Sequence, residues 1–345
     1  VVSSENVNLM KQRWHIGIGL ILSLVAVAGM LLGIRWDDLG RELAQANYWW
    51  LFPFVLLETA SIWARGMRWR VMLEEKIGSS RLFWITNISY YLNNVLPLRI
   101  GEIVRVYLAT RDSSVSGMQA ISTAVLERMI DVVTVFVLLL IVLPLVPQHE
   151  VLTAIAYWVG SAVLLGILGA FVIARRRRGF VVIVGKIAGR FMPTLRDTAM
   201  RASDEFLASL DILRGWRLGI ALVWSLVVWL LAALAAYCIL LGFLPGQPVY
   251  VGIFVTAIIA LGIALPSVPA GLGLWEAATV AALAVFGVNR EIALAYGLAM
   301  HLAVFTLMAI FGTIGLYLEG ENLNHVASAA AKFMRGLRKD RQKVR

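Results

Sequence analysis

The stretch Leu96-Pro97-Leu98-Arg99-Ile100-Gly101-Glu102 interrupts an apolar segment with a proline, a glycine and two charges. A similar interruption, LPSVPAGLG, occupies residues 265–273 and is followed by Glu276. Broken backbone at membrane depth is tolerated only where it packs inside protein or lines a cavity. Paired breaks in the two halves of a chain are typical of transporter binding sites. These two stretches therefore indicate how the chain is folded and where it acts.

The surrounding sequence is that of an all-α polytopic membrane protein. The chain has 345 residues, of which 60% are hydrophobic, and its mean hydropathy of +0.81 is too high for a soluble domain. Its apolar runs are long, unlike the alternating ten-residue segments of membrane barrels. Those predicted to span the membrane are 15–34, 49–64, 119–146, 151–174, 217–243 and 291–318.

The distribution of positive charge predicts the topology. The net charge is +10, and basic residues gather in the connection after the second span, after residue 174 and in the C-terminal tail. The residues assigned to that connection are Arg65, Arg68, Arg70, Lys76 and Arg81. Such clusters are retained in the cytoplasm. Parity then requires 82–110 and 249–288 to enter the membrane and return on the same side, as re-entrant helical hairpins, with both termini cytoplasmic.

A single membrane domain, residues 1–345, with an internal repeat follows from this topology. Span, hairpin and span over 49–146 are expected to run opposite to span, hairpin and span over 217–318, which is an inverted repeat. Residues 180–213 are predicted to form an amphipathic segment on the cytoplasmic face. The basic tail, about 325–345, is expected to form another amphipathic helix.

The first break carries a candidate anion site. Asn94 precedes it, and Arg99, Glu102 and Arg105 recur every three residues along one side of the following half-helix, with Gly101 among them. A helix N-terminus and arginine forks both favour phosphate. The alternative is that the arginines reach toward the cytoplasmic interface, with Glu102 paired to one of them.

Further charges fall within the predicted spans. Glu127, Arg128 and Asp131 open the 119–146 span, and Glu58 lies inside 49–64. Arg128 and Asp131 can form an intrahelical pair, or else Glu127 or Asp131 exchanges a proton or holds an arginine of the first break. Glu58 is either a neutralised acid or an arginine partner.

The second break offers flexible backbone and one acid. Gly271 and Gly273 allow close approach of backbone or ligand, whereas Glu276 either takes part in ion coupling or only stabilises the N-terminus of the next helix. His301 is predicted to lie at membrane depth, as a buried hydrogen-bonded residue or as a proton relay.

Other chemistry has no support in the sequence. The one cysteine, Cys238, gives no disulfide framework. Metal-ligand clusters, ordered catalytic triads and nucleotide-binding loops are not found, so we expect no enzyme activity, no catalytic residues, no metal, no cofactor and no nucleic-acid partner.

Three stretches resemble the lysylphosphatidylglycerol synthase transmembrane-region family, also called flippase-like or UPF0104 proteins. They are LPLRIGEIVR at 96–105, ERMID at 127–131 and PAGLGLWEA at 269–277, and the resemblance covers roughly 14–320. In place of the family's usual arginine before Glu276, this chain has Trp275. The resemblance implies lipid translocation in a bacterial or archaeal cytoplasmic membrane, beside lipid synthases or polyprenyl-phosphate glycosyltransferases.

We therefore expect a flippase for an anionic phospholipid or polyprenyl-phosphate lipid. One alternative is an ion-coupled carrier of a small soluble anion. Another is a scaffold that recruits a glycosyltransferase or lipid synthase without transporting anything. Frequent glycine and alanine in the 217–243 and 291–318 segments would permit close helix packing within the bundle or a homodimer.

Overall fold

The computed structural model describes residues 34–96, 100–111, 114–147, 160–161, 165–166, 169, 176–191, 196–211, 215–263, 269–323, 325–326 and 328. Every regular element in these ranges is a helix. Arg99 and the prolines at 97 and 266 lie outside them. The same holds for nearly all of the predicted 15–34 span, most of the 151–174 span and most of the basic tail.

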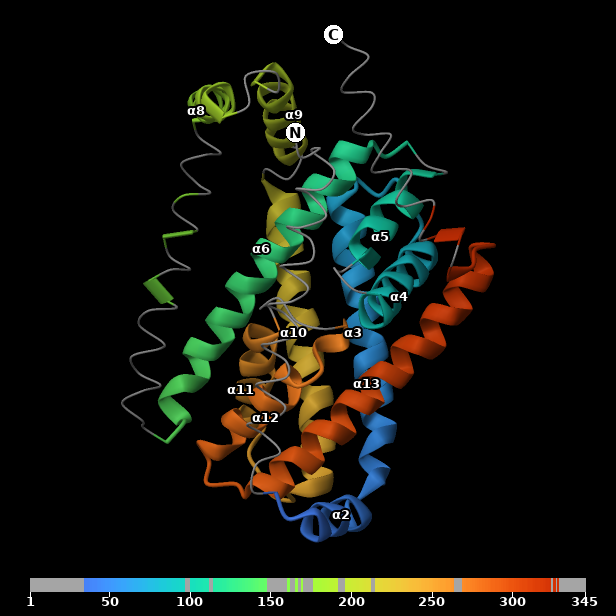
Figure 1. Ribbon diagram of the computed structural model, residues 1–345, viewed down its shortest axis with the longest axis vertical. Helices are drawn as coiled ribbons and strands as arrows, with labels where there is room; N and C mark the ends of the chain where they lie inside the picture. The colour runs from blue at the N-terminus through green and yellow to red at the C-terminus, as the bar shows by residue number, and fades with distance from the viewer. Residues whose placement is uncertain are drawn as a thin grey trace, which may run out of the picture.

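Long helices form the body of the molecule. Helices α3 (Leu51–Met72) and α10 (Trp216–Phe243) pack together along its long axis, and α6 (Gly117–Val142) and α13 (Arg290–Leu318) slant across them (Figure 1). Within the described ranges, three helical stretches are long and apolar enough to cross a membrane: Gly117–Leu145, which includes η3 (Leu143–Leu145), then Trp216–Phe243 and Arg290–Leu318. Helix α3 is also long, but it carries Glu58 and three arginines.

The two interrupted segments of the sequence become pairs of short helices. The first pair is α4 (Ser79–Val95) and α5 (Ile100–Arg111). The second is α11 (Val249–Gly262) and α12 (Leu274–Ala284), with the single turn η5 (Pro269–Gly271) before α12. At about 1.5 Å per residue, each of these helices is shorter than the roughly 30 Å hydrocarbon layer.

The two halves of the chain pack across each other. Helix α13 packs along α4 of the first pair, while α6 packs against α11 of the second pair. The turn η5 contacts α4, so the second pair reaches the first inside the bundle. Each slanting helix thus covers a short-helix pair that belongs to the other half.

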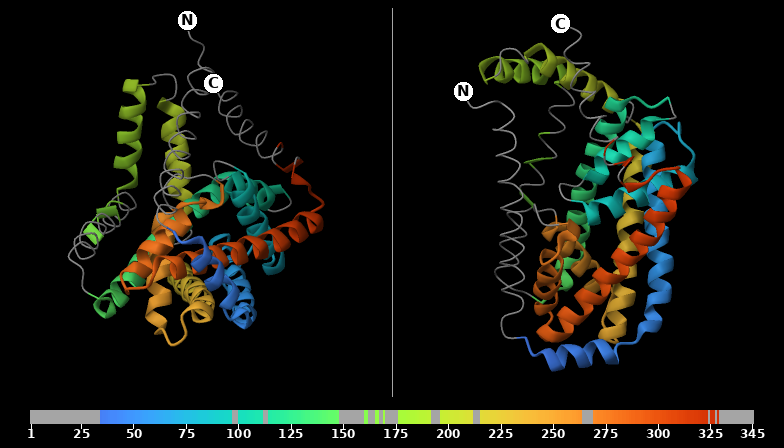
Figure 2. Two further views of the ribbon diagram at one scale, coloured as in Figure 1. Left: turned by 60° about the horizontal axis from the view of Figure 1, so that its bottom comes forward. Right: turned by 45° about the vertical axis from the view of Figure 1, so that its right-hand side comes forward.

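Further helices mark the two ends of the molecule. Helix α2 (Trp36–Gln45) and the turn η1 (Tyr48–Trp50) cover one end, and α8 (Arg177–Phe191) and α9 (Arg196–Asp211) lie at the other (Figures 1 and 2). The first short-helix pair lies toward the α9 end and the second toward the α2 end (Figure 1). Helices α8 and α9 occupy the segment expected to be amphipathic, and α8 exposes Val182, Ile183 and Ile187.

Glycines let the short helices approach their neighbours closely. A Cβ atom on Gly101 of α5 would lie 2.0 Å from the backbone oxygen of Ser89 on α4. On Gly312 of α13 it would lie 2.3 Å from the Cβ of Tyr91 on α4. These contacts leave no room for a side chain at either glycine, and they hold α5 and α13 against α4.

Ion pairs fasten the first short-helix pair to the C-terminal end of α13. Glu319, just after α13, accepts from Arg81 of α4 at 3.0 Å and pairs with Arg111 of α5 at 3.2 Å. Arg111 also pairs with Glu321 at 2.6 Å. Both arms of the first pair are therefore held at the α9 end.

The predicted connection after the second span begins too early. Helix α3 continues to Met72, so Arg65, Arg68 and Arg70 lie within it, and Arg68 is fully buried. Lys76 remains in the connection and Arg81 lies in the first turn of α4. The apolar run fades near residue 64, but packing of α3 against α10 and α4 continues the helix for two more turns.

The contact at Gly101 makes a stability prediction. Replacing Gly101 by alanine should destabilise the protein by about 1–3 kcal/mol, because the new methyl group meets a backbone oxygen that can move only with α4. Thermal unfolding in detergent, followed by size-exclusion chromatography with tryptophan fluorescence, measures the change.

Gly40→Ala is the matched control, because a Cβ there has no neighbour within 4 Å and Gly40 lies inside a helix. It should leave stability unchanged or raise it by up to about 1 kcal/mol. Equal unfolding temperatures for the two variants would contradict the close contact.

Candidate functional site

Two carboxylates on one face of α6 lie at the centre of a buried polar network. Glu127 and Asp131 are one turn apart and are 0% and 5% exposed. Arg68 of α3 lies between them, with Nη2 3.0 Å from Glu127 Oε1 and Nη1 2.6 Å from Asp131 Oδ1. The i, i+4 spacing brings both acids within reach of a single guanidinium group.

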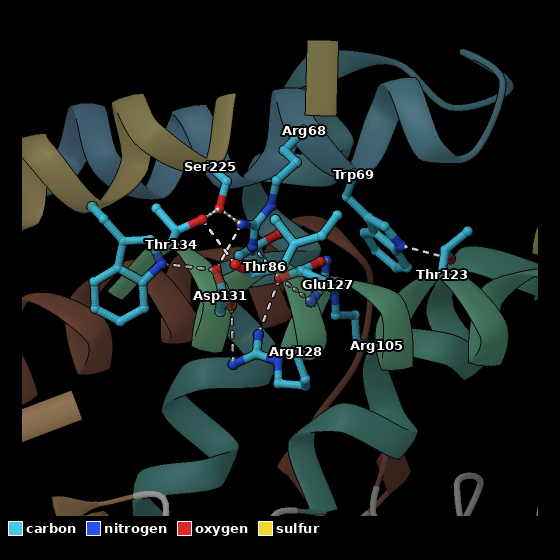
Figure 3. A network of polar contacts seen from close by, with 12 residues as sticks. Arg68, Trp69, Thr86, Arg105, Thr123, Glu127, Arg128, Asp131, Thr134 and Ser225 are labelled. Carbon is cyan, nitrogen blue, oxygen red and sulfur yellow. Dashed lines mark hydrogen bonds and ion pairs between the residues drawn. The ribbon is translucent and has the colours of Figure 1, made fainter. Parts of the chain in front are cut away.

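Arg105 of α5 approaches Glu127 from the opposite side (Figure 3). Its two terminal nitrogens donate to the two oxygens of Glu127 at 3.2 and 2.6 Å, which is a bidentate ion pair. The guanidinium carbon lies 3.8 Å from the ring centre of Trp69, the residue after Arg68. The indole N–H of Trp69 in turn donates to Thr123 of α6 at 3.1 Å. Helices α3, α5 and α6 are thereby joined around Glu127.

Helix α10 completes the network on the side of Asp131. Trp229 donates its indole N–H to Asp131 Oδ1 at 2.9 Å. The hydroxyl of Ser225 accepts from Arg68 Nη1 at 2.8 Å and lies 3.0 Å from the hydroxyl of Thr134. Charged groups on α3, α5 and α6 are therefore enclosed by polar side chains of α6 and α10.

Arg128 and Glu102 form the accessible rim of the network. Arg128 Nη2 donates to Glu127 at 3.0 Å and lies 3.9 Å from Glu102, while Nη1 lies 3.6 Å from Asp131. The side chains of Arg128 and Glu102 are 40% and 28% exposed, in contrast to the enclosed Arg68 and Arg105. Among the three described arginines of the network, Arg128 is therefore the one that is accessible.

Several buried donors of the network have no hydrogen-bond partner among the described residues. They are Nε of Arg68, Nε of Arg105 and Nε of Arg128. The hydroxyls of Ser89, Tyr90 and Ser122 nearby are also unpaired in the described part of the chain. Buried polar groups are normally satisfied by protein or by water, so the network retains capacity for oxygen acceptors.

A neighbouring arginine lies between aromatic rings. Arg65 of α3 is 5.6 Å from the ring centre of Tyr90 on α4 and 5.2 Å from that of Trp229 on α10. Glu58 lies seven residues earlier, on a similar face of α3, and is buried. Trp229 thus contacts both Arg65 and Asp131, which connects Arg65 to the network.

A second polar cluster lies between α12 and α13. His301 Nδ1 is 2.6 Å from Glu276 Oε1, and both residues are buried. Glu276 Oε2 accepts the backbone N–H of Gly273 at 2.8 Å, and the Trp275 ring stacks on His301 at 4.8 Å between centres. Gly271 and Gly273 both have positive φ angles, 72° and 84°, which glycine adopts without strain.

The residues predicted from sequence fall into these different surroundings. Glu102, Arg105, Glu127, Arg128 and Asp131 lie together in the arginine network. Arg105 is buried and lies 3.9 Å from Glu102 as well as pairing with Glu127, and the Arg128–Asp131 pair is present alongside.

Other predicted residues lie elsewhere. Glu58 lies two turns before Arg65 on α3, and Gly271, Gly273 and Glu276 belong to the second cluster. Asn94 donates to Met308 Sδ at 3.3 Å and Gly101 packs on α4. The roles in binding or coupling assigned to all these residues stay predictions.

Sequence reasoning missed Arg68, Ser225 and Trp229. Arg68 was assigned to the basic group that fixes topology, although it follows Phe54 and Ser61 at intervals of seven residues on a buried helical face. That heptad spacing was the available signal. No local signal identifies Ser225 or Trp229, because their involvement depends on how α10 packs against α3 and α6.

These features define a multi-pass helical membrane protein with a charged network inside its bundle. The model of the family described as "Lysylphosphatidylglycerol synthase TM region" matches residues 14–312. The chain belongs to this family. No solved structure shows a significant match.

Curated relatives come from archaea. The chain is 27% identical to glycosyltransferase AglD of Haloferax volcanii, over 89% of this chain and 55% of that protein, and so spans about half of AglD. It is 24% identical to UPF0104 membrane protein MJ1078 of Methanocaldococcus jannaschii, over 68% of this chain and 96% of the relative. A UPF0104 membrane protein of Methanothermobacter thermautotrophicus is 21% identical, over 88% of this chain and 96% of that protein.

The network predicts a large stability cost when Arg68 is neutralised. Arg68→Met leaves Asp131 and Glu127 buried with one counter-charge fewer, so unfolding free energy should fall by about 3–5 kcal/mol. Arg68→Lys keeps the positive charge but loses the planar guanidinium group. Its unfolding free energy should therefore lie between those of the unaltered protein and Arg68→Met. Denaturation in detergent micelles measures the unfolding free energies of the unaltered protein and the two variants.

Arg41→Met is the matched control, since Arg41 pairs with Asp38 on exposed α2. Exposed pairs contribute at most about 1 kcal/mol. If Arg68→Met were no less stable than Arg41→Met, the network would not hold the helices together.

Proposed function

We propose that this protein moves an anionic lipid across the cytoplasmic membrane, with the lipid phosphate passing the arginine network. The observation that carries the proposal is the cluster of Arg68, Arg105 and Arg128 within an apolar bundle, with N–H groups unpaired in the described part of the chain. A charge at the bilayer centre costs about 2.5–3.5 kcal/mol even on lenient scales. Such residues are usually functional rather than incidental.

The carboxylates balance the charge of the arginines when no phosphate is bound. Arg68, Arg105 and Arg128 carry three positive charges, and Glu102, Glu127 and Asp131 carry three negative ones. The network is therefore neutral without substrate. Since Arg128 is the accessible guanidinium, it would exchange a carboxylate contact for a phosphate oxygen, and a planar fork suits either partner.

The proposed topology has six spans and two re-entrant hairpins. Each short-helix pair is too short to cross and return through the full bilayer, and the pairs lie toward opposite ends of the molecule. The contact between η5 and α4 supports an arrangement in which the tips of the two hairpins meet near the midplane of the bilayer. We propose repeats at 49–146 and 217–318, with α8, α9 and both termini on the cytoplasmic side.

An apolar groove favours a lipid over a small soluble anion. The groove has a volume of about 490 Å³ and lies between η1, α3, α10 and α13. Its lining includes Tyr48, Phe54, Phe243, Leu298 and Leu302, and Leu302 is 67% exposed. An acyl chain would remain in such a groove while its headgroup crosses the polar interior.

A second candidate function is a scaffold for a lipid-modifying glycosyltransferase. The 27% identity to a protein named glycosyltransferase AglD favours it, because the chain spans about half of that protein. A glycosyltransferase would then be the partner, and the chain would hold the lipid beside it. This function predicts a stable complex on copurification and no lipid movement by the purified chain.

Reconstitution in liposomes tests translocation directly. Phosphatidylglycerol with a fluorescent headgroup is bleached from outside by a membrane-impermeant reductant, and the rate of bleaching of the inner leaflet is measured. The protein should accelerate this phase over empty liposomes. Arg128→Ala should slow it about tenfold or more, because a hydrogen bond to a charged group contributes about 1.5–3 kcal/mol.

Arg41→Ala is the control for loss of an exposed arginine and should keep the full rate. Uptake of labelled inorganic phosphate in the same liposomes distinguishes a soluble-anion carrier. The proposal fails if lipid moves no faster than in empty liposomes, or if Arg128→Ala matches the unaltered protein.

A further inference from the structure

The cluster of Glu276, His301 and Trp275 is an acid–base pair placed apart from the arginine network. Glu276 Oε1 and His301 Nδ1 are 2.6 Å apart, and their side chains are 4% and 9% exposed. A carboxylate only accepts hydrogen bonds, so Nδ1 of His301 carries the proton in this contact. The second imidazole nitrogen, Nε2, is then the position that can take up another proton.

Among the described residues, no other charged side chain forms an ion pair with Glu276 or His301. Glu276 is the sole ionisable residue of α12, and α11 contributes only Tyr250, which packs against Phe286. On α13, Arg290 and Glu291 lie three turns from His301, and Tyr296 donates to Ala236. On α4, which contacts η5, the charged residue is Arg81 at the far end, paired with Glu319, and Tyr90 and Tyr91 are its other ionisable groups.

Helices α2, α3 and α10 also pack against α13. None of their ionisable residues forms an ion pair with Glu276 or His301, and neither does Tyr317 in the last turn of α13: they are Asp37, Asp38, Arg41 and Glu42 on α2, Glu58, Arg65, Arg68 and Arg70 on α3, and Arg217, Tyr237 and Cys238 on α10.

We propose that the Glu276–His301 pair is a proton-binding site that couples proton movement to lipid movement. Without the extra proton, neutral His301 donates from Nδ1 to the Glu276 carboxylate and the pair has a charge of −1. Uptake of one proton at Nε2 gives an imidazolium that still donates to Glu276, and the pair becomes neutral. In an apolar bundle, neutralising an unbalanced charge is favourable, and histidine can make this change near physiological pH.

The pair is connected to the meeting point of the two short-helix pairs. Glu276 Oε2 accepts from the N–H of Gly273 at 2.8 Å, which fixes the turn before α12. This turn includes Ala270 and Gly271 at positive φ angles of 59° and 72°, and η5, to which both residues belong, contacts α4. A full positive charge on His301 draws the carboxylate toward the imidazole and weakens its hold on Gly273. Protonation would thereby alter the contact between the two halves.

A metal cation is a poor alternative occupant. Sodium requires several oxygen ligands, but among the described residues the side chains of this pair offer one carboxylate, already bonded to Gly273 and His301, and one imidazole. Within the described ranges, no group of three metal-ligating side chains is found. A proton needs only the free imidazole nitrogen.

Trp275 provides a direct readout of this proton. Its ring stacks on His301 at 4.8 Å with an interplanar angle of 18°. A protonated imidazole quenches the fluorescence of a stacked indole, whereas a neutral imidazole quenches it weakly. The difference in emission between the unaltered protein and Trp275→Phe should therefore rise about twofold as the pH increases from about 5 to 8, the range in which histidine changes charge.

Two histidine variants serve as a matched set in this titration. His301→Gln keeps a donor toward Glu276 but cannot take up a proton, so the pH-dependent emission should disappear. His325→Gln should leave it unchanged, because His325 pairs with Glu321 on the exposed surface and lies on a different segment. Emission independent of pH, or unchanged in His301→Gln, overturns the proton site whatever the protein transports.

The coupling, which rests on the proposed lipid movement, needs a separate measurement. Liposomes with a gradient of one pH unit should develop up to about tenfold lipid asymmetry if one proton moves per lipid, because one pH unit corresponds to a tenfold ratio. His301→Gln and Glu276→Gln should abolish this asymmetry. Lipid movement between the two leaflets in the absence of a pH gradient should continue in both variants.

The outcomes separate the two proposals. If lipid moves but a pH gradient does not bias it, or a sodium gradient does instead, proton coupling is wrong and the flippase stands. If no lipid moves at all, both the flippase and the coupling fail, and the fluorescence titration still decides whether the pair binds a proton.

Discussion

The polar interior of this protein depends on the buried charge of Glu127. Its carboxylate contacts Arg68, Arg105 and Arg128, which come from α3, α5 and α6. Two like charges 4 Å apart repel by about 4 kcal/mol at the effective dielectric constant of a protein surface. Guanidinium groups could not share this volume without an acid between them. The short helix α5 is thereby fixed in position, with Arg105 stacked on Trp69 and bonded to Glu127.

This constraint makes the first short-helix pair a rigid unit. Gly101 packs on Ser89 between its two arms, Arg105 joins it to α6, and Arg81 and Arg111 join it to Glu319 after α13. A movement of this pair relative to α6 or α13 has to break buried or partly buried ion pairs. In the proposed function, exchange of a carboxylate for a phosphate at Arg128 would leave these remaining contacts in place.

The sequence predicts the helices well, because long apolar runs and proline and glycine breaks are local signals. The helices at 216–243 and 290–318 begin within one residue of the expected positions. Arg105–Glu127 was among the predicted pairings. Arg68 was missed because an arginine near a helix end looks the same in sequence whether it faces the cytoplasm or the bundle. His301 was not paired with Glu276, 25 residues away, because only the crossing of α12 and α13 brings them together.

The two clusters occupy equivalent places in the two halves but differ in chemistry. In each half, a buried polar pair joins the second short helix to the following long helix: Arg105–Glu127 between α5 and α6, and Glu276–His301 between α12 and α13. Arginine stays charged at every physiological pH, whereas histidine does not. A binding site for a phosphate requires a charge that is always present, and a site that responds to protons requires one that changes. Under the proposed function, the arginine pair would therefore serve phosphate binding and the histidine pair the response to protons.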